Sequence, residues 1–405
     1  MSRAAVRPCP VCLHSSVTPL HFQRFLLQEN HPLANGYEVV CCDSCGFVYA
    51  DSAVTQEDYN RFYASFSKYE DKEIGTGGGE STSDADRLTN TAKCIAAFLP
   101  NRAARILDVG CANGGLLLRL KQMGFKNVCG FDLPAGCVEN TRKLGITAHF
   151  GSVTEHPPGV GKFDLIILSH VLEHLRDLHE AVQGVERLLQ NGGHIYIEVP
   201  DASEYASHVV APFQDFNTEH INHFSMRSVE NLMGMLGFSG HGLGQKVFES
   251  TPGMSYPAHY GFWAKSKDAA FKVRRDDVLV KRIGEYIARS RAMMDQMDAR
   301  LKKVLAKSPE VIVWGTGQLA MKLLVETSLA RAAIVAFIDG NPINAGKKLK
   351  GIEIKLPSQL AGLPQPIVIT TTLHQQAIAD RIRNELRLPN EIVFLEEPKS
   401  PARSS

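Results

Sequence analysis

One stretch, ARILDVGCANGGLLLRL (residues 104–120), constrains the fold most, because it has the pattern of a buried strand, a glycine-rich turn and a helix. A second apolar segment, NVCGFDL, contains another acid, Asp132, twenty-four residues after Asp108. Two more apolar segments, FDLIILS and GGHIYIEVP, follow with helical patterns between them. This alternation is typical of a parallel, doubly wound sheet, whose ligands lie at the carboxyl ends of its strands.

The chain is long for a single core, since 405 residues favour two or three domains. We predict a zinc-binding module at 1–72, the central α/β domain at 85–265, a helical linker at 268–306 and a second α/β domain at 309–397. The Gly-, Ser- and Thr-rich segment 73–84 is expected not to pack.

The composition is that of an ordinary globular protein, with 44% hydrophobic and 21% charged residues and a net charge of +1. It shows no long basic run and no apolar run long enough to span a membrane. We therefore expect a cytoplasmic protein, a monomer or small homo-oligomer, with no nucleic-acid or membrane partner. In that compartment its nine cysteines should be thiols or metal ligands.

Four of these cysteines form two C-x-x-C pairs: Cys9 with Cys12, and Cys42 with Cys45. Two such pairs complete a tetrahedral S4 site suited to structural Zn²⁺, with no open position for catalysis. Gly46 permits the tight turn after the second pair. Cys41 could replace Cys42, although only Cys42 keeps the two-residue spacing. We expect chelation to loosen residues 1–70 and to leave the central domain folded.

The series D-x-G-x-A-x-G, GFDL, GSVTEHP and FDLIILSHVLEHL resembles, over residues 88–265, the class I S-adenosylmethionine (SAM)-dependent methyltransferases. The resemblance implies that Asp108, Gly110 and Gly114 hold the methionine end of SAM. It also implies further contacts: Asp132 with the ribose, Leu133 and Ser152 with the adenine, and Ser169 or His170 on the far wall. Ala112 stands at the usual middle glycine of the loop. An NAD-binding Rossmann domain is the alternative for the same loop.

The C-terminal segments VIVWGTGQLAMKLL and FIDGNP repeat the strand, glycine and acid pattern with Gly315, Gly317 and Asp339. Ala320 occupies the third glycine position of a dinucleotide-binding fingerprint. Two readings stay open for this Rossmann-like half-domain of about ninety residues. It could bind a nucleotide, or it could be a cofactor-free half-domain used for docking or substrate closure.

The three parts in this order resemble the sugar C-methyltransferases, which include enzymes that methylate C3 of dTDP-4-keto-deoxysugars, as on the tetronitrose pathway. The resemblance implies C-methylation of a nucleotide-linked keto-sugar, with His220 of the segment DFNTEHINHF as the base and Glu219 as its partner. Carbon methylation needs such a base, because a proton beside a carbonyl must be removed and the enolate stabilised.

Further substrate contacts are expected from the same segment and from an early tyrosine: Asn217, His223, Tyr63 and Tyr69. Asn217 stands where the family has a tyrosine. His223 could equally be scaffolding bonded to backbone carbonyls. Glu173 and His174 of the LEHL segment are expected to cap and orient a helix.

Other functions remain open from the sequence. One is methyl transfer to oxygen or nitrogen of a sugar or another small molecule. Another is an RNA methyltransferase whose zinc module binds nucleic acid, although residues 1–70 carry no excess of Lys and Arg over Asp and Glu. A third is a nicotinamide-dependent reductase or an isomerase built on the C-terminal half-domain.

Overall fold

The computed structural model describes residues 1–66, 77–251, 253–266, 271–360 and 362–396. The chain forms two compact units. Unit 1 comprises Met1–His21, Glu38–His208 and Glu219–Gly284, and unit 2 comprises Phe22–Tyr37, Val209–Thr218 and Glu285–Ser405. The four-part division expected from the sequence remains a prediction. Within the described ranges, every helix is too short or too polar to cross a membrane.

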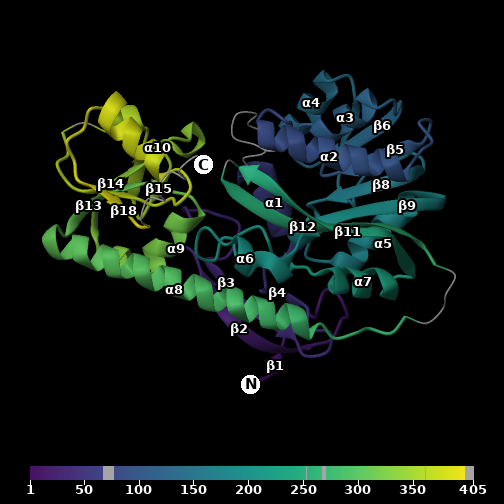
Figure 1. Ribbon diagram of the computed structural model, residues 1–405, viewed down its shortest axis with the longest axis horizontal. Helices are drawn as coiled ribbons and strands as arrows, with labels where there is room; N and C mark the ends of the chain where they lie inside the picture. The colour runs from purple at the N-terminus through teal and green to yellow at the C-terminus, as the bar shows by residue number, and fades with distance from the viewer. Residues whose placement is uncertain (67–76, 252, 267–270, 361, 397–405) are drawn as a thin grey trace, which may run out of the picture. The chain divides into compact units, whose positions relative to one another are not determined.

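Unit 1 is built on a seven-stranded sheet (Figure 1). Its strands are β5 (Arg105–Val109), β6 (Asn127–Asp132), β7 (Thr147–Phe150), β8 (Phe163–Ser169), β9 (Leu189–Pro200), β11 (Phe238–Thr251) and β12 (Met254–Lys265). Their order is β11-β12-β9-β8-β5-β6-β7. The strands from β5 to β9 are parallel, as predicted, whereas β12 is antiparallel to both β9 and β11. A dinucleotide-binding sheet would continue in parallel past β9, so this order argues against the NAD reading.

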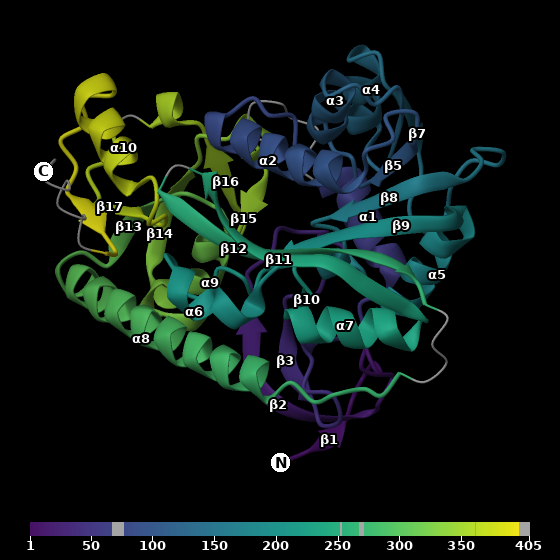
Figure 2. The same ribbon diagram turned by 45° about the vertical axis from the view of Figure 1, so that its right-hand side comes forward.

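Helices cover both faces of this sheet (Figures 1 and 2). On one face lie α2 (Thr82–Phe98), α3 (Gly115–Gln122) and α4 (Ala135–Lys143), and on the other α5 (Leu178–Leu188) and α7 (Met226–Met235). Strand residues alternate between the two cores, as the two-residue period of a strand requires. In β8, Leu165 and Ile167 pack with α2 and α3, and Ile166 and Leu168 pack with α5 and α7.

The N-terminal part of the chain forms a five-stranded sheet in the order β1-β2-β3-β4-β10. Its strands are β1 (Arg3–Ala4), β2 (Ser16–Arg24), β3 (Gly36–Cys42), β4 (Val48–Asp51) and β10 (Asn222–His223). The helix α1 (Gln56–Phe66) follows, and the short α6 (Tyr205–His208) precedes β10 in the sequence. This sheet therefore takes its last strand from the segment that carries His220.

The glycine-rich segment before α2 packs, contrary to the expectation from its composition. The structure describes it from Gly77 onward. Ser81 is the N-cap of α2 and accepts a hydrogen bond from the Asp84 N–H. The Gly115 N–H donates to the Gly77 carbonyl at 2.9 Å. Local composition was misleading here, because the partners of these glycines come from α2 and α3.

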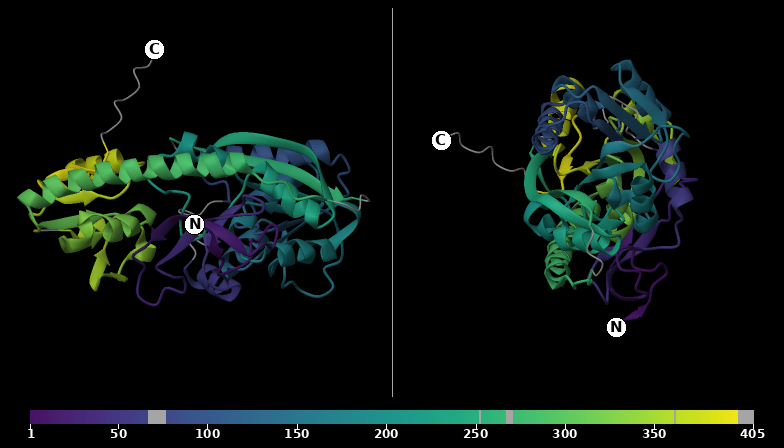
Figure 3. Two further views of the ribbon diagram at one scale, coloured as in Figure 1. Left: turned by 90° about the horizontal axis from the view of Figure 1, so that it is seen from below. Right: turned by 90° about the vertical axis from the view of Figure 1, so that its right-hand side faces the viewer.

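Unit 2 contains a six-stranded sheet in the order β15-β16-β14-β13-β17-β18. Its strands are β13 (Glu310–Trp314), β14 (Ala333–Ile338), β15 (Lys348–Leu349), β16 (Ile352–Lys355), β17 (Ile367–Ile369) and β18 (Ile392–Phe394), with helices α9 (Gln318–Glu326) and α10 (Gln375–Asp380). All strands but β15 are parallel, which confirms a Rossmann-like half-domain. The polar segment before it forms one continuous helix, α8 (Asp277–Lys307), visible in Figure 3.

Candidate active site and metal site

The four predicted cysteines meet in unit 1. All four sulfur atoms lie within 4.8 Å of one another, with Cys9 Sγ 3.6 Å from Cys45 Sγ and Cys12 Sγ 3.5 Å from Cys42 Sγ. A Zn²⁺ ion with Zn–S bonds of about 2.3 Å places its ligands about 3.8 Å apart, so the donor set fits this ion. Cys41 lies outside the cluster, and burial raises the pKa of its thiol to about 11.

The cysteine module shares its core with the rest of unit 1. Its buried apolar residues belong to the same cluster as the helices α5 and α7. The buried Arg7 guanidinium donates to the carbonyl of Arg176 at 2.9 Å and to Asn222 Oδ1 at 3.1 Å. The Ala50 N–H donates to the carbonyl of Ile221 at 2.9 Å. The module therefore supports the residues directly after His220, and the independent loosening expected from the sequence does not follow from this packing.

The predicted cofactor acids lie at the carboxyl ends of β5 and β6. Asp132 accepts hydrogen bonds from the N–H groups of Ala112 at 2.7 Å and Leu133 at 2.8 Å. Burial raises the pKa of Asp132 to about 6, although these two bonds oppose the rise. Burial and the charge of Asp132 raise the pKa of Asp108 to about 8, and Arg87 opposes that rise. Two buried acids whose pKa values stay raised despite the charge of Arg87 are suited to a ligand that brings positive charge.

These two pKa values predict that cofactor binding depends on pH. At pH 7 an Asp108 carboxyl with a pKa of about 8 is mostly protonated. The ammonium group at the amino-acid end of the ligand binds the ionised carboxylate, so Asp108 must first lose its proton. The affinity for S-adenosylhomocysteine (SAH) should therefore rise from pH 6 to pH 8, by up to about tenfold per unit, and level off above. Calorimetry in buffers of different ionisation enthalpy should show proton release. The SAH affinity of the Asp108→Asn variant should not depend on pH. A wild-type affinity that stays constant from pH 6 to pH 8 would contradict the prediction.

Two glycines of the first loop adopt a backbone conformation that residues with a Cβ rarely adopt. Gly110 and Gly114 have φ of 76° and 79°. A Cβ would lie 2.9 Å from Val171 Cγ2 in the first case and 2.8 Å from Thr141 Oγ1 in the second. Ser152 follows β7, and its hydroxyl accepts the Glu155 N–H at 3.0 Å. The loop thus has the shape expected of a cofactor cradle, whereas the Ser152 side chain closes a local turn.

Ser169 is the last residue of β8, and His170, which follows it, joins a buried charge network. Its ring nitrogens lie 3.2 Å from Glu173 Oε1 and 3.2 Å from Glu198 Oε1. Burial opposes protonation, but the two carboxylates outweigh it and raise the pKa of His170. Lys246 Nζ donates to Glu198 Oε2 at 2.7 Å. Sequence reasoning missed Glu198, although an acid inside the apolar strand HIYIEVP was the available signal.

A second cluster brings His220 together with residues that follow β8. The ring centroid of His220 lies 4.9 Å from that of His174, which lies 5.8 Å from that of Tyr63. His174 Nδ1 is 3.1 Å from the Glu219 carbonyl. A carbonyl only accepts, so Nδ1 carries the proton and Nε2 can act as an acceptor when the ring is neutral. Glu173 is buried, with one carboxylate oxygen 4.0 Å from His174 Nε2.

Glu173 and His174 are the residues whose part in this site was not expected from the sequence. The neighbouring parallel strands β8 and β9 end at the same edge of the sheet, and each is followed by one half of the cluster. Glu173, His174 and His220 also place one donor atom each within 4.8 Å of one another. Apart from the cysteines, this is the other set in the described part of the chain that could hold a metal ion.

The remaining predicted substrate residues lie in different surroundings. His223 is fully buried in β10, beside the Tyr205 ring, and burial lowers its pKa to about 3. This placement favours scaffolding. Tyr69 lies outside the described residues. Asn217 belongs to unit 2, where its carbonyl accepts the Tyr37 hydroxyl at 2.8 Å.

Unit 2 holds the segment 209–218 from several sides. The Phe213 N–H donates to Ser290 Oγ at 3.0 Å, and the Asp215 N–H donates to the Tyr286 hydroxyl at 2.9 Å, both on α8. From α9, Lys322 Nζ donates to the Phe213 carbonyl, and burial lowers the pKa of this lysine to about 7. The segment that leads into Glu219 is thus part of the C-terminal half-domain.

The glycine turn of that half-domain is satisfied by its own residues. Asp339 Oδ2 accepts the Thr316 N–H at 3.0 Å, and Oδ1 accepts the Asn341 N–H at 2.8 Å. Gln318, the first residue of α9, donates to Thr218 Oγ1 at 2.9 Å. Asp132 in unit 1 accepts two N–H groups of its own turn in the same way, so these bonds leave both interpretations of the half-domain open.

The strand order, the glycine loop after β5 and the acid after β6 define the class I SAM-dependent methyltransferase fold, as the sequence predicted. Residues 84–241 match the family described as Methyltransferase domain. This part of the chain is therefore a SAM-dependent methyltransferase domain, and the SAM prediction is confirmed at that level.

Individual relatives are similar over parts of the chain. The tRNA U34 carboxymethyltransferase of Campylobacter hominis is 29% identical over 107 residues, which are 25% of this chain and 38% of the relative. The ajmaline N-methyltransferase of Rauvolfia serpentina is 27% identical over 152 residues, 35% of this chain and 52% of the relative. The chain thus spans about half or less of the length of these relatives. The crystal structure of magnesium protoporphyrin IX methyltransferase from Synechocystis PCC 6803 with bound SAH has a TM-score of 0.42 at 17% identity, covering 52% of this chain and 100% of that one.

Proposed function

We propose that the protein methylates a carbon atom of a nucleotide-linked keto-deoxysugar with SAM, and that His220 removes the proton. The observation that carries this proposal is the cluster of Tyr63, His174 and His220 at the carboxyl ends of β8 and β9, the edge at which β5 and β6 also end. A donor loop and a candidate base therefore share one edge of one sheet. The resemblance to the sugar C-methyltransferases supplies the acceptor class.

The chemistry assigned to the cluster is a proton transfer followed by carbon–carbon bond formation. His220 accepts the proton from the carbon beside the carbonyl, and the electron pair left on that carbon attacks the methyl group in line with its sulfur. SAM would supply the methyl group: the bond between sulfur and the methyl carbon breaks, its electron pair stays on sulfur, and SAH with its neutral thioether leaves. The buried Glu173 carboxylate stabilises the positive charge that the neighbouring histidines then carry. Structural Zn²⁺ is proposed for the four cysteines.

A second candidate is methyl transfer to oxygen or nitrogen of a sugar or another small molecule. Asn217 in place of the family's tyrosine favours it, because an amide replaces the phenol expected to handle the keto-sugar. An RNA acceptor has less in its favour, since residues 1–70 are not basic although one relative acts on tRNA. The cytoplasmic location stays a prediction.

Proton exchange tests the proposed reaction. In deuterated water, with a dTDP-4-keto-deoxysugar and SAH, we expect the enzyme to exchange the α-proton of the sugar, measured by mass spectrometry. His220→Ala should abolish the exchange. Methyl transfer from SAM without any exchange would contradict C-methylation and favour an oxygen or nitrogen acceptor. Calorimetric binding of SAM without binding of NAD(H) would set aside the reductase reading.

A further inference from the structure

Three glycines before α2 form a short strap, Gly77–Gly79, that is tied to that helix. The N–H groups of Gly77 and Gly79 both donate to Asp84 Oδ2 at 2.8 Å. The second oxygen of this carboxylate accepts Arg87 Nη2 at 2.7 Å. The Asp84 side chain is almost fully buried. One carboxylate in the first turn of α2 therefore sets the path of the strap.

The strap lies directly on the loop between β5 and α3. Besides the bond from Gly115 to the Gly77 carbonyl, the two backbones approach so closely that side chains are excluded. A Cβ on Gly77 would lie 2.7 Å from the Cβ of Ala112. A Cβ on Gly115 would lie 2.6 Å from the Gly77 carbonyl oxygen. The absence of a Cβ at Gly77 thus leaves space for the methyl group of Ala112. A glycine at position 112, the usual residue of this loop, would have no such group.

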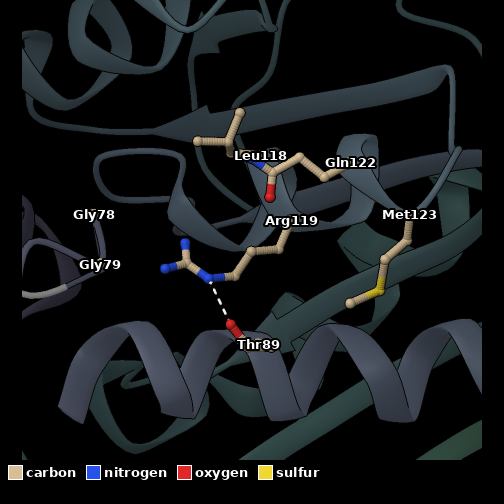
Figure 4. Close-up of a pocket in the computed structure, with 7 residues that line it drawn as sticks. All are labelled: Gly78, Gly79, Thr89, Leu118, Arg119, Gln122 and Met123. Atoms are coloured by element: carbon tan, nitrogen blue, oxygen red, sulfur yellow. Dashed lines mark hydrogen bonds between the residues drawn. The ribbon is translucent and has the colours of Figure 1, made fainter. Parts of the chain in front are cut away.

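Arg119 of the helix α3 lies beside the other end of the strap (Figure 4). Arg119 Nη1 donates to the Gly115 carbonyl at 2.9 Å, and Nε donates to Thr89 Oγ1 on α2 at 3.0 Å. A Cβ on Gly79 would lie 2.3 Å from Arg119 Nη2. Gly79, Thr89 and Arg119 line a pocket whose lining includes none of the predicted cofactor residues. The pocket therefore lies between the strap and the helices α2 and α3, and it is not the predicted cofactor site.

The contacts of the strap indicate which end of the cofactor it serves. Ala112 lies between Gly110 and Gly114, the two glycines expected at the methionine end. The adenine is expected further along, past Asp132. Arg87, which binds Asp84, also lies close enough to Asp108 for its charge to act on that carboxyl.

We propose that Gly77–Gly79 is a wall of the site for the methionine end of SAM and that Asp84 is the residue that positions it. This inference rests on the proposed use of SAM at the β5 loop. The inference gives Gly77–Gly79 a role in the cofactor site, although the composition of this segment alone is typical of a linker. A Cβ at Gly77, or loss of the Asp84 carboxylate, displaces the strap and with it the loop that holds the amino-acid part of the ligand.

Two probes that differ in that part test the proposal. SAH carries the amino-acid end, and 5′-methylthioadenosine lacks it. By calorimetry we expect Gly77→Ala and Asp84→Ala to weaken SAH binding about tenfold or more and to change methylthioadenosine binding less than twofold. Gly284→Ala on α8 is the control, because a Cβ there meets no atom within 4 Å and Gly284 lies outside the strap. It should leave both affinities unchanged.

Equal losses for the two probes, or no loss for SAH, would overturn the inference. If Asp84→Ala does not fold, Asp84→Asn replaces it, and the change in SAH affinity is again compared with the change in methylthioadenosine affinity. The amide oxygen of Asn keeps one acceptor, so this variant should weaken SAH binding less than Gly77→Ala does.

Adding Ala112→Gly to Gly77→Ala removes the methyl group that the new Cβ meets. It should restore part of the SAH affinity, and no recovery would count against the packing argument. A wild-type protein that binds neither probe would instead refute the proposed function.

Discussion

Replacing His220 by alanine is expected to lower methyl transfer to a dTDP-4-keto-deoxysugar by about 10²–10⁴-fold, the usual contribution of a general base. The affinity for SAM should change less than twofold, because the donor residues follow β5 and β6 and His220 lies on the chain after β9. Initial rates with radiolabelled SAM and calorimetric titration measure the two quantities. The loss should appear in kcat with little change in the KM for SAM.

A matched control separates this effect from the loss of any histidine. His241 is an exposed histidine on β11 of the same unit, and His241→Ala should keep full activity. Both variants should unfold at the wild-type temperature within a few degrees. Turnover that survives in His220→Ala would remove this residue from the mechanism, and His174, whose Nε2 is an available acceptor, would be the next base to test.

Removing Cys42, a proposed zinc ligand, is expected to destabilise all of unit 1. Structural zinc contributes about 10–16 kcal/mol of apparent binding free energy in small zinc domains, which exceeds the total stability of most proteins. The sheet of the cysteine module takes β10 from the chain after His220, and its core is continuous with α5 and α7. We therefore expect Cys42→Ala to lose zinc, activity and cooperative unfolding together. Elemental analysis, calorimetry and hydrogen exchange at residues 221–224 measure these losses.

The neighbouring Cys41→Ala is the control, because Cys41 is buried beside the cluster but is not part of it. It should keep one zinc per chain and lose only about 1 kcal/mol of unfolding free energy. Exchange that increases in residues 1–50 while α5 and α7 stay protected would show that the module folds independently. A second metal ion per chain that is lost in His174→Ala would make Glu173, His174 and His220 metal ligands, and His220 could then not serve as the base.

Much of the fold could be predicted because its signals are local. The strands around Asp108, Asp132 and Ser169 are short apolar runs followed by turn residues, and each forms where the pattern places it. Ser225 caps α7 through a capping box with Ser228, a contact that spans three residues. Two C-x-x-C pairs bring their sulfur atoms together through knuckle geometry, so the choice of Cys42 over Cys41 could also be made from spacing.

The candidate site was predicted only in part, because its contacts join segments far apart in the sequence. His220 could be chosen from its segment, whereas His174, forty-six residues earlier, was assigned to helix capping. The Glu198 carboxylate beside His170 bridges twenty-eight residues. The burial of His223 depends on its pairing with β4, which no local pattern encodes. The backbone path of Gly77–Gly79 depends on α2 and α3, and composition pointed the other way.

The amino-acid sequence by itself determined the α/β class, the glycine-rich loop after β5, the two cysteine pairs and a short list of candidate bases. These follow from the period of apolar residues and from spacings of a few positions, which act within one strand, turn or helix. The tertiary structure alone decided which segments meet. It brought the histidines together, placed the carboxylates beside them and brought the glycine backbones into close contact. Such contacts depend on the pairing of β8 with β9 and of β4 with β10, and long-range pairing arises only when the whole core packs.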